Sequence, residues 1–329
     1  MYKIIIAILI TFHIGTVKSQ DLHLSMYDAA PLFLNPAMTG VFEGDWRIHG
    51  QYRTQWKSVN FKPYTTGLIS FDKSVKKWGL GGQIANYRAG IGNYNVIQGL
   101  LSAGYTIPLN AKKTHNLSFG VQGGVSQKSV EYQLHTFNNQ YVTTNGGGFD
   151  NALSSGEDFG GQSFIIPELN AGAMYYYAKQ QSRLNPFIGV SVFNILTPKE
   201  SFFSADNLLP LRIYAHVGTR INITEALYII PKVLYQQQEQ FQEITFAADA
   251  SYYLKSSDIH LLGGVVYRAK DAFFINLGAK IANYRLKLGY DINTSSLTSS
   301  SGGRGGFEVS FTYIHKNKDF KHIKVCPRL

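Results

Sequence analysis

The side chains of this 329-residue chain that could perform catalysis are not spaced for it. Its histidines are scattered and show none of the paired spacings that zinc ligands adopt. The single cysteine, Cys326, allows neither an internal disulfide nor a thiolate metal cluster. A serine hydrolase needs a nucleophile, a base and an orienting group, and the sequence has no Gly-x-Ser-x-Gly elbow. We therefore predict a protein that is not an enzyme and that needs no metal or cofactor.

Glycines recur in two stretches, 79–82 and 263–264, and glycine-rich loops can bind phosphate. A phosphate loop needs a following helix, whose N-terminus holds the anion. Neither stretch precedes a helical pattern, so we interpret the glycines as positions of close backbone approach and curvature within strands.

The elements that carry these residues are predicted to be strands. From Trp46 onward, about fourteen runs of roughly ten residues alternate apolar and polar side chains. Residues 307–313 (FEVSFTY) are the clearest example. The predicted strands are 46–55, 63–72, 77–87, 94–108, 115–126, 164–178, 184–195, 211–222, 226–236, 242–255, 259–268, 272–281, 284–292 and 306–314. After the first residues no apolar run could form a spanning helix, so two-faced strands of this length predict an all-β, antiparallel transmembrane barrel of about 14 strands over 46–314.

The first 19 residues have the pattern of a cleaved signal peptide. Lys3 gives a positive start, residues 4–14 are mostly apolar, and Val17-Lys18-Ser19 precedes an expected cut at Gln20. Residues 20–45 are not strand-like and contain an Asn-Pro step, so we expect a periplasmic or plug-like segment near or inside the barrel mouth. Residues 315–329 form an expected periplasmic tail.

The connections between predicted strands alternate in length. Short ones include 73–76 and 282–283, whereas 127–163, 196–210 and 293–305 are long. Outer-membrane barrels have short periplasmic turns and longer outside loops, so an even strand count places both termini in the periplasm of a Gram-negative bacterium. Aromatic side chains cluster near the strand ends, where girdles at the two membrane surfaces are expected.

The net charge of +10 could indicate a nucleic-acid partner, but the basic residues are dispersed and alternate with apolar ones. We interpret them as lumen and rim charges that meet membrane lipid or an acidic partner, not nucleic acid. The predicted inward charges allow a basic pore lining or a lumen closed by salt bridges, and we favour the second. Such a network would need acids from loops or from residues 20–45. These inward charges are Arg47, Arg53, Arg212, Arg220, Lys232, Asp249, Arg268, Arg285, Lys287, Asp291 and Glu308.

Several motifs, in order and spacing, resemble one family over nearly the whole mature chain. They are Pro31–Ala37 (PLFLNPA) with Gly40, Arg53-x-Gln55-Trp56, 63–72, Tyr267-Arg268, Asp271-Ala272-Phe273, 288–291, 306–309 and the tail Cys326-Pro327-Arg328. With these motifs the chain resembles the PorP/SprF family of outer-membrane proteins, associated with type IX secretion and gliding motility in Bacteroidetes. Leu329 departs from the pattern, where a Phe is expected.

The resemblance implies a role in protein secretion. Members are similar to accessory barrels that support secretion or surface attachment of particular adhesins carrying a C-terminal sorting domain, and that associate with periplasmic ring or lipoprotein components. Asn35, Pro36, Arg53 and Trp56 would be conformational anchors or partner contacts, and Cys326, Pro327 and Arg328 a docking tail. Two alternatives remain open: an outer-membrane channel or transporter for small molecules, and a soluble β-sandwich.

Overall fold

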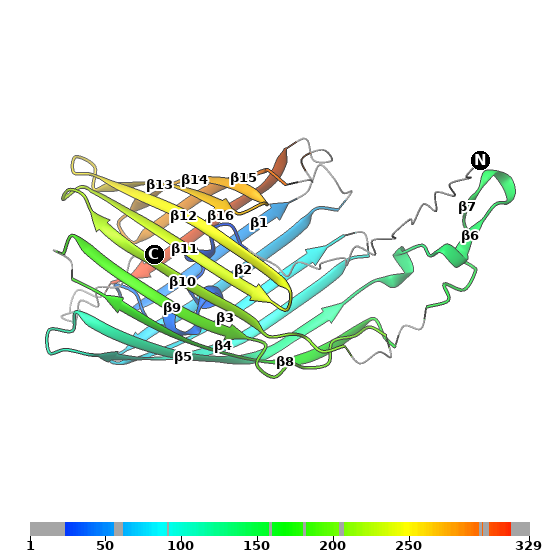
Figure 1. The fold of residues 1–329 in the computed structure, drawn as a ribbon, viewed down its shortest axis with the longest axis horizontal. Helices are drawn as coiled ribbons and strands as arrows, with labels where there is room; N and C mark the ends of the chain where they lie inside the picture. Colours follow the sequence, from blue (N-terminus) through cyan, green and yellow to red (C-terminus); the bar gives the residue numbers. More distant parts are fainter. Residues whose placement is uncertain are drawn as a thin grey trace, which may run out of the picture.

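In the computed structural model, the described parts of the chain are residues 24–55, 62–90, 92–157, 160–179, 182–203, 207–295, 298 and 303–316. Fourteen antiparallel strands form one closed barrel (Figure 1). They are β1 (Trp46–Gln55), β2 (Tyr64–Val75), β3 (Trp78–Ala89), β4 (Tyr94–Pro108), β5 (His115–Ser129), β8 (Ser163–Tyr177), β9 (Leu184–Phe193), β10 (Arg212–Asn222), β11 (Leu227–Gln238), β12 (Phe241–Leu254), β13 (Ile259–Arg268), β14 (Ala272–Ile281), β15 (Tyr284–Asn293) and β16 (Arg304–His315).

The barrel closes because its first and last strands pair along their whole common length. β1 pairs with β16 from Trp46↔His315 to Gln55↔Gly306, and every other strand pairs with its neighbours in chain order. Each of the fourteen predicted strands coincides with one of these strands to within three residues at either end. The predicted fold class is therefore confirmed, and a β-sandwich is excluded.

The alternation of side chains is inverted relative to a water-soluble protein. Along β1 the inward residues His49, Gln51 and Arg53 are buried, whereas Ile48 and Tyr52 are exposed on the outer surface. Leu101, in the middle of β4, is 77% exposed. A continuous apolar outer surface is stable only against lipid, because in water it would cost about 25 cal/mol for each Å² left exposed. Among the described residues no helix is long and apolar enough to cross a membrane.

The two ends of the barrel differ. At one end the strands are joined by the short connections 76–77, 109–114, 178–183, 223–226, 255–258 and 282–283; we call this the turn end. The opposite end, here the loop end, carries the long connections 130–162 and 194–211. At the loop end β5 and β8 continue beyond the other strands, and the chain between them forms an arm that projects from the barrel (Figure 1). The arm contains a small hairpin of β6 (Tyr141–Val142) and β7 (Gly148–Phe149).

Aromatic side chains line the outer surface near the turn end. The rings of Trp78 and Tyr105 pack at a tilt of 58° with centroids 4.7 Å apart, and the ring centroids of Tyr284 and Tyr313 are 4.9 Å apart. Rings with a polar tip are stable at the level of lipid headgroups, as the girdle prediction requires. Tyr87 and Tyr176 are also among the aromatic residues near strand ends that the sequence predicts for the girdles, but they lie elsewhere: Tyr176 is buried in the lumen, and Tyr87 packs against an interior apolar cluster.

Candidate functional site

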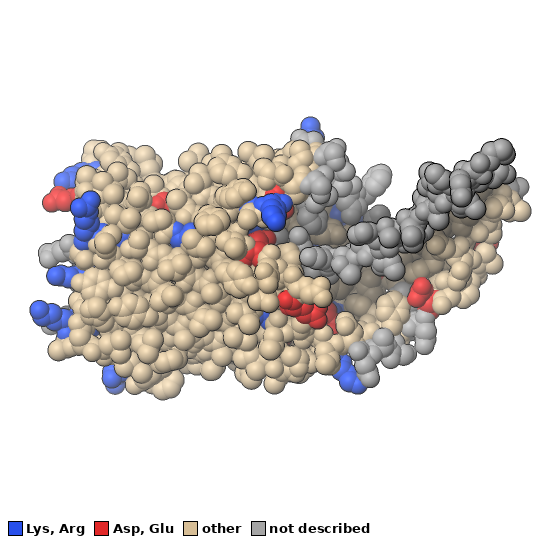
Figure 2. Space-filling model, in the orientation of Figure 1, with Lys and Arg blue, Asp and Glu red and all other residues tan. Residues whose placement is uncertain are grey.

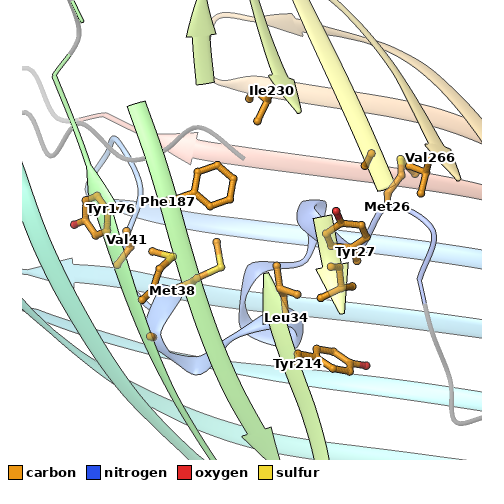
Figure 3. Packing of buried hydrophobic residues seen from close by; sticks show 14 of the residues in the cluster. Met26, Tyr27, Leu34, Met38, Val41, Tyr176, Phe187, Tyr214, Ile230 and Val266 are labelled. Carbon is orange, nitrogen blue, oxygen red and sulfur yellow. The ribbon is translucent and has the colours of Figure 1, made fainter. Parts of the chain in front are cut away.

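The described part of the N-terminal segment, Leu24–Gly44, lies inside the barrel; we call it the luminal segment. It forms three short helical turns, η1 (Tyr27–Ala29), α1 (Pro31–Leu34) and η2 (Pro36–Met38). A proline begins both α1 and η2, where its missing N–H costs no hydrogen bond. The apolar side chains of the luminal segment pack against inward residues of the wall. Among them, Met38 and Leu34 lie near the wall residues Phe187 and Tyr214 (Figure 3).

The first contact between the luminal segment and the wall consists of hydrogen bonds to buried carboxylates of the wall. The backbone N–H groups of Ser25 and Met26 donate to the two carboxylate oxygens of Glu308, at 2.9 and 3.0 Å. Arg53 and Arg268 donate to Asp291 at 2.7 and 3.1 Å, and the Ser25 hydroxyl also bonds Asp291. Because the buried carboxylates are paired with arginine and hydrogen-bonded, their desolvation is compensated.

A second ionic cluster lies deeper along the segment. The Lys232 ammonium binds Asp28 of η1 at 2.5 Å and also contacts Asp249, which accepts from Lys287 at 3.1 Å. Tyr27 lies beside this cluster, with the Lys232 Nζ 5.9 Å from its ring centroid. Burial raises the pKa of the Tyr27 phenol, so this hydroxyl stays protonated.

Asn35 forms hydrogen bonds with both atoms of its side-chain amide, one within η2 and the other to the wall. Its Oδ1 accepts from the Ala37 N–H at 2.9 Å, which caps η2. Its Nδ2 lies 3.3 and 3.2 Å from the carbonyl oxygens of Ala173 and Val190, and 3.2 Å from His216 Nε2. One side chain therefore holds the luminal segment to β8, β9 and β10 together.

Glycines in the wall make room for the backbone of the luminal segment. A Cβ on Gly120 would overlap the backbone of Pro36 and Ala37, and a Cβ on Gly79 would overlap the carbonyl of Thr39. A third anchor lies nearby, where the Gly40 N–H donates to Asp72 at 2.8 Å and Arg47 pairs with the same carboxylate at 2.8 Å. The backbone of the luminal segment thus lies directly against glycines of the wall, and charged wall residues hold the segment at several points along its length.

Among the described residues, the inward cations Arg47, Arg53, Lys232, Arg268 and Lys287 are paired with acids. Asp28 supplies an acid from within residues 20–45, as the favoured interpretation requires. Sequence reasoning missed Asp72 and His216, which hold Gly40 and Asn35. Both lie at inward positions of alternating strands, so the alternation itself was the available signal. In the described part of the chain, no group of three His, Cys, Asp or Glu residues could hold a metal ion.

The predicted site residues are only partly brought together. Asn35 and Pro36 are buried in the luminal segment, and Arg53 lies in the Glu308 cluster of the wall. None of these three is exposed to a partner from outside. Trp56 and the Cys326–Arg328 tail lie outside the described residues.

The arm at the loop end carries exposed apolar side chains. Tyr141 and Phe149, each 51% exposed, pack edge-on with ring centroids 5.3 Å apart across the β6–β7 hairpin. At the base of the arm, Phe202 of the 194–211 connection lies 4.8 Å from the Phe164 ring. Lys128 of β5 and Glu200 pair there at 2.5 Å, so the 194–211 connection is held to the ends of β5 and β8 beside the barrel rim.

Comparison with solved structures supports the fold alone. The toluene transporter TbuX of Ralstonia pickettii superposes with a TM-score of 0.52 at 10% identity, covering 87% of this chain and 94% of the transporter. A monoaromatic hydrocarbon channel, the TodX deltaS2S3 mutant, gives a TM-score of 0.50 at 9% identity, with 86% and 92% coverage. No curated protein matches the chain.

A family match covers most of the sequence. Residues 16–313 match the family described as type IX secretion system membrane protein PorP/SprF. This range contains the luminal segment and nearly all of the barrel. A barrel of this type in such a family lies in the outer membrane. The chain belongs to the PorP/SprF family of type IX secretion system membrane proteins.

Proposed function

We propose that this protein is a partner-binding barrel of the type IX secretion and gliding motility machinery, which supports secretion or surface attachment of one adhesin with a C-terminal sorting domain. Family membership supports a role in this secretion system. The observation that carries the finer proposal is a lumen occupied by the protein's own chain, combined with an arm that projects from the loop end. Such a molecule offers its loops, rather than its interior, to a partner.

The arm is the surface that we assign to the adhesin. Tyr141, Phe149, Leu134 and Leu153 are exposed on it, at 51%, 51%, 46% and 42%. Aromatic side chains bring large contact areas at low entropic cost and are enriched in binding hot spots. We place the loop end outside the cell and the turn end in the periplasm, with the expected signal peptide 1–19 removed. The tail 315–329 would then be available to ring or lipoprotein components.

Deleting the gene tests the proposal. One adhesin is expected to disappear from the cell surface while other type IX cargo is still secreted. A Tyr141→Ser, Phe149→Ser double variant should reproduce this loss while still folding into the membrane, because both side chains project from the arm. The matched control is Phe203→Ser, which removes an exposed ring, 43% exposed, from the other long connection. Normal adhesin display in the deletion strain would refute the proposal.

A channel for small molecules is the alternative. The similarity to hydrocarbon channels concerns the fold and carries no functional argument at 10% identity. The luminal segment opposes this alternative, since its backbone contacts the wall glycines directly. Planar bilayers containing the purified protein should show no stable conductance. Steady open conductance of the wild-type protein would favour the channel.

A further inference from the structure

Exposed cationic side chains gather at the turn end of the barrel. They occupy the end of β2, the turns that join β2 to β3, β4 to β5, β8 to β9 and β12 to β13, and the chain leaving β16. Figure 2 shows them at the end opposite the arm. We call this set the basic collar. Its members are Lys73, Lys76, Lys77, Lys112, Lys113, Lys179, Arg183, Lys255 and Lys316.

Acids do not balance the collar. Among the described residues of the turn end, the exposed acids are Glu225 and Asp258, and the half-buried Glu43 lies 3.8 Å from the Lys316 ammonium. Glu225 faces Lys255 at 3.7 Å, and Asp258 accepts from the Tyr253 hydroxyl at 3.0 Å. The loop end is different, because the exposed cations and anions among its described residues are similar in number. These are Lys62, Arg88, Lys199, Lys270 and Arg304 against Glu131, Asp150, Glu157 and Glu239.

The collar lies directly beyond the outward-facing aromatic rings. Lys76 and Lys77 immediately precede Trp78, which is 54% exposed on the outer surface. Tyr252, 50% exposed, lies three residues before Lys255 at the other side of the barrel. Indole and phenol rings occupy the boundary between acyl chains and headgroups, so the amines one to three residues further along reach the phosphate level.

We infer that the basic collar binds the headgroups of anionic phospholipids in the leaflet that faces the turn end. A lysine close to an anionic membrane surface gains about 1 kcal/mol, so several act together. Seven of the nine cations lie at the three neighbouring turns between β2 and β9, and Lys255 and Lys316 lie further around the barrel. The turns are also short, which keeps the amines within the headgroup layer. Because short turns of such barrels face the periplasm, the leaflet is the inner one of the outer membrane.

The tryptophans of the chain provide a direct probe. Trp46 and Trp78 both begin strands at the turn end, so a Trp56→Phe background leaves reporters at the collar alone. The full chain is reconstituted in phosphatidylcholine bilayers containing a small fraction of brominated phosphatidylglycerol or brominated phosphatidylcholine. We expect stronger quenching by phosphatidylglycerol, and we expect the preference to decrease between 0.1 and 1 M NaCl as the Debye length falls from about 10 to 3 Å.

Charge removal at either end separates collar binding from a general effect of charge. A variant with Gln at positions 76, 77, 112 and 113 should lose about half of the preference, since four of nine cations are removed. The control variant carries Gln at positions 62, 88, 270 and 304 of the loop end and should keep the full preference for phosphatidylglycerol. Heat-modifiable gel mobility checks that both variants are folded.

Three results would overturn the inference. These are equal quenching by the two lipids, a preference that ignores salt, and the same loss in both variants. If the collar variant kept its lipid preference but lost a co-purifying acidic periplasmic protein, the collar would be a protein-binding surface instead. The inference does not depend on the adhesin proposal, because it requires only a folded barrel in a bilayer.

Discussion

At the scale of single residues, the buried polar groups of the luminal segment differ in how many of their hydrogen bonds are formed. Asn35 uses both its oxygen and its nitrogen, whereas the Tyr27 hydroxyl, buried in the same segment, has no hydrogen-bond partner in the described structure. A buried polar group without a hydrogen bond lowers the free energy of unfolding, whereas a hydrogen-bonded one raises it. Neighbouring positions should therefore respond to truncation with opposite signs.

Replacing Tyr27 by Phe is expected to stabilise the barrel by about 1 kcal/mol, because it removes a buried hydroxyl that forms no hydrogen bond. Urea-induced unfolding in detergent micelles measures the change. Tyr235→Phe is the matched control, since it deletes a hydroxyl that donates to Gln237 at 2.9 Å and should not stabilise the protein. Destabilisation by Tyr27→Phe would contradict the assignment of this hydroxyl as unpaired.

Replacing Asn35 by Ala is expected to destabilise the protein by about 2 kcal/mol, because the cap of η2 and the bonds to the wall are lost together. Asn35→Asp should be at least as harmful, since a carboxylate would face the carbonyls of Ala173 and Val190. The midpoint of heat-modifiable gel migration reports both. Asn151→Ala, at an exposed arm position, should leave the midpoint unchanged.

At the scale of elements, the luminal segment and the wall are matched by backbone proximity. The wall contributes glycines where η2 crosses β4, β5 and β8, so any side chain there competes directly with the segment. The elements are thus interdependent, although each strand is defined by its own alternation.

A Gly120→Val substitution should displace η2 from the wall, because its side chain would overlap the backbone of Pro36 and Ala37. We expect chymotrypsin to cleave the luminal segment near Phe33 in this variant and not in the wild-type protein. Gly99→Val is the control, because a Cβ at Gly99 has no atom within 4 Å. A protected segment in the Gly120 variant would show that the contact tolerates a side chain.

At the scale of the whole molecule, the outer surface is apolar over the middle of the barrel and charged at its ends. The middle must therefore lie in hydrocarbon, with the aromatic rings marking its limit at the turn end. This arrangement predicts that the cost of a charged substitution depends on its height along the barrel.

Leu101→Arg should cost about 2–4 kcal/mol, whereas Leu109→Arg should cost about 0–1 kcal/mol. Leu101 lies in the middle of β4 and Leu109 follows its end, and both are exposed, at 77% and 55%. Unfolding titrations in lipid vesicles measure both values. Equal costs would contradict the placement of the bilayer around the barrel.

The fold of this protein could be predicted from its sequence because strand alternation is a local property. In 307–313, residues two positions apart have the same polarity, which shows that they lie on the same face of the strand. The same two-residue period recurs in the other predicted strands. The resemblance of PLFLNPA and other motifs to one family was also readable, and the family match agrees with it.

The pairing of the charges inside the lumen was decided by tertiary structure alone. Ser25 meets Glu308 across 283 positions of sequence, and Lys232 meets Asp28 across 204. No periodicity links residues so far apart, because their proximity exists only once the strands have closed into a barrel with a fixed register. The sequence by itself therefore determined a two-faced barrel with inward charges and indicated a periplasmic or plug-like N-terminal segment, and only barrel closure decided which charges pair and which wall residues hold that segment.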